Sequence, residues 1–113
     1  MITIGICDDD ALEREKLIHF CGQCLTDECA YAVKAYSSAE EVLENELPDI
    51  LLLDVELEGM DGICLKERLE ERDRRVRILF VTSHGELALE GYGEGVYGFL
   101  TKPLDYGKFH IKM

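Results

Sequence analysis

The chain has 113 residues, of which 47% are hydrophobic and 8% aromatic. These values are ordinary for a globular domain and exclude an intrinsically disordered segment. The length corresponds to one domain with a core large enough to fold without disulfides. The 24 acidic and 12 basic residues leave a net charge of −12. Because DNA and RNA binding depends on neutralising phosphates with Lys and Arg, this charge argues against direct nucleic-acid binding by the domain.

The apolar runs are far shorter than the roughly 20 residues that a membrane-spanning helix needs. The N-terminal residues Met1–Ile4 lack the basic flank and long apolar stretch of a signal peptide. The sequence therefore predicts a cytoplasmic domain with no membrane association.

Five cysteines, an odd number, argue against a disulfide framework in such a chain. Cys21 and Cys24 have the C-x-x-C spacing, with His19 and Cys29 nearby, so a zinc site and a redox pair both require consideration. A structural zinc site usually takes two ligand pairs from separate segments, and the sequence contains no second pair. A redox pair would be expected to open a helix after a strand. We interpret the cysteines as small apolar residues on the core face of a helix.

The hydrophobic pattern alternates between strands and helices along the whole chain. Short apolar or alternating runs predict strands, and apolar residues at helical spacing predict helices. We expect strands over Ile2–Cys7, Tyr31–Tyr36, Ile50–Leu53, Val76–Val81 and Gly98–Leu100. We expect helices over Ala11–Leu25, after a capping box at Ser37–Glu41, from Asp61 or Gly62 onward, weakly over Glu86–Tyr92, and from Leu104 to Met113.

Alternation of this kind predicts a parallel sheet with right-handed crossover helices. Polar residues follow four of the expected strands: Asp8 and Asp9, Asp54, Thr82 and Lys102. Because the carboxyl ends of parallel strands share one edge of the sheet, we expect these side chains to converge there.

Such a set of residues is suited to phosphoryl transfer. Three clustered carboxylates repel one another unless a cation compensates them, and Mg²⁺ prefers such oxygen ligands. Asp54, a charge at the end of an aliphatic run, is the candidate nucleophile. Lys102 supplies a positive charge and Thr82 a hydroxyl donor for phosphoryl oxygens.

Helix capping is the alternative explanation for some of these acidic residues. Capping the following helix accounts well for one residue of Asp8–Asp10, but not for all three. For Asp61 we favour a capping role over a role in the site.

With these residues in this order, the sequence resembles the receiver domains of two-component response regulators. The segments that carry the resemblance are Ile6–Asp10, Asp49–Asp54 with Gly59–Gly62, Ile78–Thr82, and Leu100–Leu104. They extend over essentially the whole chain, in the order and spacing of the family. Arg14-Glu15 and Ala88–Glu90 look closest to receivers that precede a LytTR-type DNA-binding domain.

The resemblance implies an α/β, doubly wound, five-stranded (βα)₅ flavodoxin-like fold with strand order 2-1-3-4-5. It implies that Asp54 accepts a phosphoryl group from a sensor histidine kinase. It also implies that Asp9, Asp54 and the backbone carbonyl of Glu56 hold Mg²⁺, with Asp8 acting through water. Thr82 and Lys102 would bind phosphoryl oxygens, and Phe99 would be the aromatic switch residue. The Lys102–Pro103 peptide bond is usually cis in this family.

Three features depart from the family pattern. Phe99 lacks a tyrosine hydroxyl, so its rotation could be sensed only by packing. Glu58 replaces a common proline in the loop after Asp54, and Gly91, Gly93 and Gly95 fall in the expected fourth helix.

The resemblance also bears on organisation. Residues 1–113 would form one receiver domain with a truncated last helix. A transcriptional output domain would lie outside the chain, and a homodimer could form through the fourth helix and fifth strand.

Two alternative functions remain. A haloacid-dehalogenase-type phosphatase also uses a strand-end Asp, but it requires Asp where this chain has Glu56 and an acidic pair after, not before, the lysine. A pseudo-receiver would keep the fold as an interaction module without phosphorylation.

Overall fold

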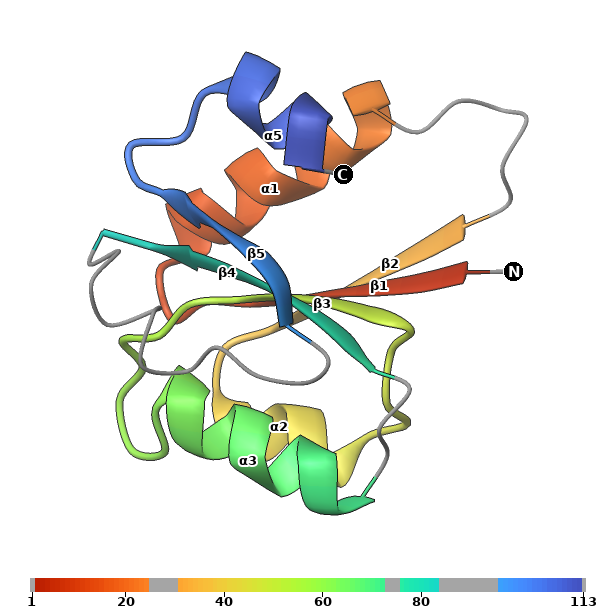
Figure 1. Ribbon diagram of the computed structural model, residues 1–113, viewed down its shortest axis with the longest axis vertical. Helices are drawn as coiled ribbons and strands as arrows, with labels where there is room; N and C mark the ends of the chain where they lie inside the picture. The colour runs from red at the N-terminus through yellow and green to blue at the C-terminus, as the bar shows by residue number, and fades with distance from the viewer. Residues whose placement is uncertain (1, 25–30, 73–75, 84–95, 113) are drawn as a thin grey trace.

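Five parallel strands form the central sheet in the described part of the chain (Figure 1). The computed structural model describes residues 2–24, 31–72, 76–83 and 96–112. The strands lie in the order β2-β1-β3-β4-β5, as predicted. Their bounds are β1 (Ile2–Cys7), β2 (Tyr31–Tyr36), β3 (Ile50–Leu53), β4 (Arg77–Thr82) and β5 (Val96–Thr101).

Helices cover both faces of this sheet, so the fold is doubly wound (Figure 1). Helices α1 (Ala11–Cys24) and α5 (Tyr106–Lys112) lie on one face, and α2 (Ala39–Glu44) and α3 (Gly62–Arg72) lie on the other. The helix expected over Glu86–Tyr92 falls outside the described residues. Among the helices that are described, none combines the length and apolar character needed to cross a bilayer.

Two apolar clusters, one on each face, hold the layers together. Leu51, Leu53 and Phe80 belong to the cluster under α2 and α3, whereas Leu52 and Leu79 belong to the cluster under α1 and α5. Because both faces are covered, β3 and β4 are continuous apolar runs rather than alternating ones. This burial fixes the ends of β3 and β4 relative to β1 at the edge where the acidic residues lie.

Two of the acidic residues near this edge, Asp10 and Asp61, cap helices. Asp10 Oδ1 accepts the Leu12 N–H of α1 at 2.9 Å, and Asp61 Oδ1 accepts the Cys64 N–H of α3 at 2.8 Å. Both therefore satisfy N–H groups that the first turn of a helix leaves unpaired. In the first cluster, Asp8 and Asp9 remain for another role.

Asp49 links three strands at the opposite, amino-terminal edge of the sheet. Its carboxylate accepts the Thr3 N–H at 2.8 Å, and its own N–H donates to the Thr3 carbonyl at 2.9 Å. Its carbonyl accepts the Arg77 N–H at 2.9 Å. The start of β3 is thus joined by hydrogen bonds to β1 and to the start of β4.

The last two elements differ in their bounds from the sequence prediction. Strand β5 begins at Val96, two residues before the expected Gly98, and an irregularity in the register with β4 lies between Ile78 and Leu79. Helix α5 begins at Tyr106, and Asp105 Oδ1 accepts the Lys108 N–H at 3.2 Å. The helix was expected to start at Leu104. Leu104 instead lies between the cis Lys102–Pro103 peptide bond and the Asp105 cap.

The cysteines of α1 agree with the core interpretation. Cys21 is fully buried and Cys24 is half-buried, and within the described residues neither belongs to a cluster of potential metal ligands. Cys29 lies outside those residues. Burial raises the pKa of the Cys21 thiol to about 12, and burial with the adjacent Asp8 and Asp54 carboxylates raises the pKa of Cys7 to about 12.

Alkylation should therefore divide the cysteines into two groups. At about pH 8 the buried thiols of Cys7 and Cys21 remain protonated and inaccessible, because only the thiolate reacts. We expect iodoacetamide to label the half-buried Cys64 and to leave Cys7 and Cys21 unmodified until denaturant is added. Peptide mapping by mass spectrometry measures this, and rapid labelling of Cys21 in the native protein would contradict the core assignment.

Candidate functional site

An acidic cavity of about 530 Å³ lies at the carboxyl-terminal edge of the sheet. The segments that follow β1, β3 and β5 all contribute to it. Its charged lining consists of seven carboxylates and one ammonium group: Asp8, Asp9, Asp10, Asp54, Glu56, Glu58, Asp61 and Lys102. The convergence expected from a parallel sheet therefore occurs for Asp8, Asp9, Asp54 and Lys102.

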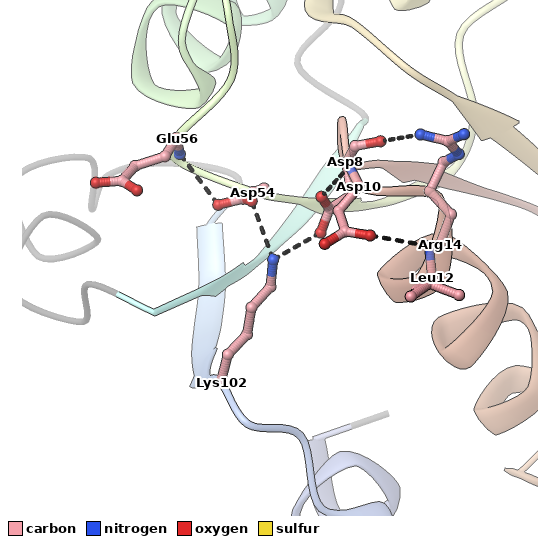
Figure 2. Close-up of polar contacts among 7 residues, drawn as sticks. All are labelled: Asp8, Asp10, Leu12, Arg14, Asp54, Glu56 and Lys102. Carbon is pink, nitrogen blue, oxygen red and sulfur yellow. Dashed lines mark hydrogen bonds and ion pairs between the residues drawn. The ribbon is translucent and has the colours of Figure 1, made fainter.

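Lys102 bridges two of these carboxylates (Figure 2). Its Nζ lies 2.7 Å from Asp8 Oδ2 and 3.1 Å from Asp54 Oδ2. The three side chains are largely shielded from water, with exposed fractions of 15% for Lys102, 1% for Asp8 and 9% for Asp54. A buried ammonium between two carboxylates is the arrangement that such charges need to be tolerated in a protein interior.

Burial and ion pairing shift the pKa values of Lys102 and Asp54 in opposite directions. Burial alone would lower the pKa of Lys102, but the hydrogen bonds and charges of Asp8 and Asp54 outweigh it, so the Lys102 pKa is raised. Burial raises the pKa of Asp54, and the Lys102 ammonium counteracts this only in part. Asp54 is thus a carboxylate with incomplete charge compensation.

Asp54 is held by backbone contacts at the end of β3. Its N–H donates to the Cys7 carbonyl at 3.0 Å, and its Oδ1 accepts the Glu56 N–H at 3.0 Å. Gly62, at the start of α3, packs directly on its carbonyl, since a Cβ atom at Gly62 would lie 2.3 Å from that oxygen. The Asp54 carboxylate therefore has a fixed direction into the cavity (Figure 2).

Asp8 is held equally firmly, by a contact that the sequence did not predict. Its N–H donates to the Tyr36 carbonyl at 3.2 Å, and its Oδ1 accepts the Asp10 N–H at 2.9 Å. The Arg14 guanidinium, one turn into α1, donates to the Asp8 carbonyl at 2.6 Å (Figure 2). In the sequence, Arg14 served only as a sign of family resemblance. A basic residue one turn after an acidic loop is a weak signal, because a solvated side chain would give the same pattern.

The carboxylates of Asp8, Asp9 and Asp54 form a potential cation site. One oxygen from each lies within 4.8 Å of the others, and Asp9 is exposed to solvent. An all-carboxylate donor set suits a hard divalent cation such as Mg²⁺ or Ca²⁺ and does not suit a soft metal. The donors present therefore fit the metal implied by the sequence.

Thr82 and Phe99 occupy different surroundings. Thr82 ends β4, is fully buried, and through its carbonyl accepts the Lys102 N–H at 2.9 Å. It is adjacent to the site through this bond but does not line the cavity. Phe99 is half-buried on β5, pairs in register with Phe80, and packs on the apolar cluster under α2 and α3.

Comparison with known proteins gives a consistent assignment. Residues 4–113 match the family described as the response regulator receiver domain. The positive alginate biosynthesis regulatory protein of Pseudomonas aeruginosa is 37% identical over 106 residues, which cover 91% of this chain and 42% of that protein. The sensory transduction protein LytT of Bacillus subtilis is 29% identical over 105 residues, covering 93% of this chain and 44% of that protein. The chain thus spans less than half the length of these relatives.

Solved structures agree with the fold. The non-phosphorylated HemR receiver domain of Leptospira biflexa superposes with a TM-score of 0.82 at 25% identity, covering 99% of this chain and 90% of that one. The activated DrrB receiver domain superposes with a TM-score of 0.83 at 23% identity, covering 99% of this chain and 93% of that one. Because residues 4–113 match this family and the sheet order agrees with it, the chain belongs to the response regulator receiver domain family of two-component signalling.

Proposed function

We propose that Asp54 is the residue that accepts the phosphoryl group in this receiver domain. The observation that carries the proposal is the placement of its carboxylate in the acidic cavity. It lies 3.1 Å from the Lys102 ammonium and close to the carboxylates of Asp8 and Asp9. Burial raises the pKa of Asp54, and its deprotonated carboxylate is the form that would attack phosphorus.

The transfer itself exchanges one bond to phosphorus for another. The P–N bond of a phosphohistidine on the partner kinase breaks, an Asp54 oxygen forms the new P–O bond, and the electron pair returns to the imidazole. In this proposal the Lys102 ammonium would balance the charge of the phosphoryl oxygens. Its present bonds to Asp8 and Asp54 hold it within reach of that position.

In this proposal Mg²⁺ is the cation, held by Asp9, Asp54 and the Glu56 carbonyl, with Asp8 acting through water. When bound, it would neutralise charge on the phosphoryl group. The Thr82 carbonyl accepts the Lys102 backbone N–H. In this proposal the Thr82 hydroxyl would donate a hydrogen bond to a phosphoryl oxygen. Phe99 would transmit the change through its packing on the apolar cluster, since it has no hydroxyl.

The partners follow from the same proposal. A sensor histidine kinase would supply the phosphoryl group, and the domain would control a longer protein in the cytoplasm.

Residues 1–113 would form the receiver domain, with a transcriptional output of LytTR type outside it. Relatives named as transcriptional or sensory regulators support this organisation. The face of the fourth helix and fifth strand would mediate dimerisation. The domain would act as an acceptor with slow self-dephosphorylation, not as a turnover enzyme.

Intact mass spectrometry after incubation with Mg²⁺ and acetyl phosphate tests the proposal. We expect the mass of one phosphoryl group to be added to the parent protein, and Asp54→Asn to abolish the addition. Asp105→Asn is the matched control, because Asp105 caps α5 away from the cavity and asparagine caps equally well. This control should incorporate phosphate like the parent.

Each other outcome supports a different function. No addition to the parent would support a pseudo-receiver, and repeated release of phosphate from a phosphomonoester would support a phosphatase. Retained addition in Asp54→Asn would place the acceptor at another residue.

A further inference from the structure

The loop between β3 and α3 carries two groups of the proposed site, Asp54 and the Glu56 carbonyl. Two bonds within the segment shape this loop: the Glu56 N–H donates to Asp54 Oδ1 at 3.0 Å, and the Gly62 N–H donates to the Val55 carbonyl at 2.8 Å. Both bonds lie near the ends of the loop. The middle of the loop, at Gly59 and Met60, requires a partner from elsewhere.

Glu40 of α2 supplies that partner. Its Oε1 accepts the Met60 N–H at 3.1 Å, although the two residues are 20 positions apart in the chain. Gly59 lies beside the same carboxylate, since a Cβ atom there would be at van der Waals contact, 3.4 Å, with both Glu40 oxygens. Gly59 also has φ of +78°, in the left-handed region that glycine adopts without strain. The loop is therefore shaped to present the Met60 N–H to Glu40.

Helix capping does not account for this contact. The N-terminus of α2 is capped by Ser38, whose Oγ accepts the Glu41 N–H at 3.1 Å. Glu41 in turn accepts from the Ser37 hydroxyl and N–H. Glu40 lies in the same first turn, but its carboxylate is directed to the loop instead of to the helix end.

We propose that Glu40 is a positioning residue for the phosphoryl site, acting through the Met60 N–H; the inference rests on the proposed function of Asp54. By fixing the middle of the loop, Glu40 limits the positions that the Glu56 carbonyl and the Asp54 carboxylate can adopt. The constraint matters in this chain because Glu58, unlike the proline common in the family, leaves the backbone of the loop unrestricted. The hydrogen-bond acceptor, not the negative charge, is the part of Glu40 that acts.

Three variants separate these two properties. Glu40→Ala removes the acceptor and the charge, Glu40→Gln keeps an acceptor without the charge, and Glu44→Ala removes the same charge from an exposed site on the same helix. The readouts are hydrogen exchange of the Met60 amide, Mg²⁺ affinity from amide shifts in NMR titrations, and the initial rate of phosphorylation by acetyl phosphate. All three are measured at a temperature far below the unfolding temperature of each variant.

We expect Glu40→Ala to speed Met60 exchange, and to weaken Mg²⁺ binding and slow phosphorylation by about two- to tenfold, the size of one lost hydrogen bond. Glu40→Gln and Glu44→Ala should stay within about twofold of the parent. Equal effects of Glu40→Ala and Glu44→Ala, or of Glu40→Ala and Glu40→Gln, would show that charge alone acts and overturn the inference.

The proposed function and this inference fail in distinguishable ways. A parent protein that takes up no phosphoryl group contradicts the role of Asp54. The Met60 exchange and the Mg²⁺ titration still test Glu40 in that case, because neither depends on phosphorylation. Unchanged Met60 exchange in Glu40→Ala would overturn the inference even if phosphorylation of the parent succeeds.

Discussion

Replacing Gly62 by alanine is expected to lower the free energy of unfolding by about 2 to 3 kcal/mol. The new Cβ atom would lie 2.3 Å from the Asp54 carbonyl oxygen and 2.9 Å from Val55 Cα. These neighbours are backbone atoms, which cannot rotate away as a side chain can. The start of α3 must move, and this weakens the 2.8 Å hydrogen bond from the Gly62 N–H to the Val55 carbonyl.

Gly22→Ala is the matched control for this change. Gly22 is exposed in α1, and a Cβ atom there would meet nothing within 4 Å. Alanine should therefore stabilise the domain by up to about 1 kcal/mol, because it loses less conformational entropy than glycine in a helix. Urea unfolding followed by circular dichroism measures both variants. Two changes of the same sign would mean that contact with the Asp54 carbonyl is not what requires glycine at position 62.

Lys102→Met is expected to destabilise the metal-free domain by about 2 to 3 kcal/mol. It leaves the carboxylates of Asp8 and Asp54 buried without their shared ammonium partner. The raised pKa of Lys102 means that its contribution is fully present below its ordinary pKa of 10.5 and is lost only as the pH rises through the folded-state value. Unfolding in the presence of a chelator at neutral pH therefore measures the whole effect.

The same substitution at Lys66 provides the control. The Lys66 side chain is as buried as that of Lys102, with an exposed fraction of 10%, and its Nζ pairs at 2.8 Å with Glu70, whose side chain is 38% exposed. Because the carboxylate left behind is hydrated, Lys66→Met should cost only about 0.5 kcal/mol. If the cavity carboxylates bind Mg²⁺ as proposed, millimolar Mg²⁺ should stabilise both variants, and it should stabilise Lys102→Met more, because that variant has lost the competing ammonium. Equal losses in the two variants would show that the bridge to Asp8 and Asp54 contributes no more than a pair with one solvent-exposed carboxylate.

The architecture could be predicted because local patterns and tertiary structure agree. The aliphatic run Ile50–Leu53 has no helical periodicity and is too short for a helix, so it indicated a strand covered on both faces. Once a parallel sheet is inferred, the convergence of Asp8, Asp54 and Lys102 at its carboxyl-terminal edge can be predicted without knowing any side-chain conformation. The sequence also predicted that one residue of Asp8–Asp10 caps the following helix, since a helix start requires a cap, and the structure identifies it as Asp10.

What the sequence could not predict depends on contacts between distant residues. The Glu40 bond to Met60 and the Arg14 bond to the Asp8 carbonyl join side chains to backbone groups, and backbone groups carry no signature in a sequence. The early start of β5 depends on the irregular register with β4 near Ile78, which only the paired strands define. Such interactions are tertiary, and propensity is a weak guide to them.

The hydrogen bonds of Asp49 have a mechanical consequence for any signal that starts at Asp54. They join β1, β3 and β4 at the edge of the sheet farthest from the acidic cavity. Strands joined at this edge cannot slide past one another without breaking those bonds, and the Asp54 N–H bond to the Cys7 carbonyl also joins β3 to β1 at the other edge. A change in charge in the cavity is therefore expected to move the loops and side chains at that edge, while the register of the strands stays the same through repeated cycles.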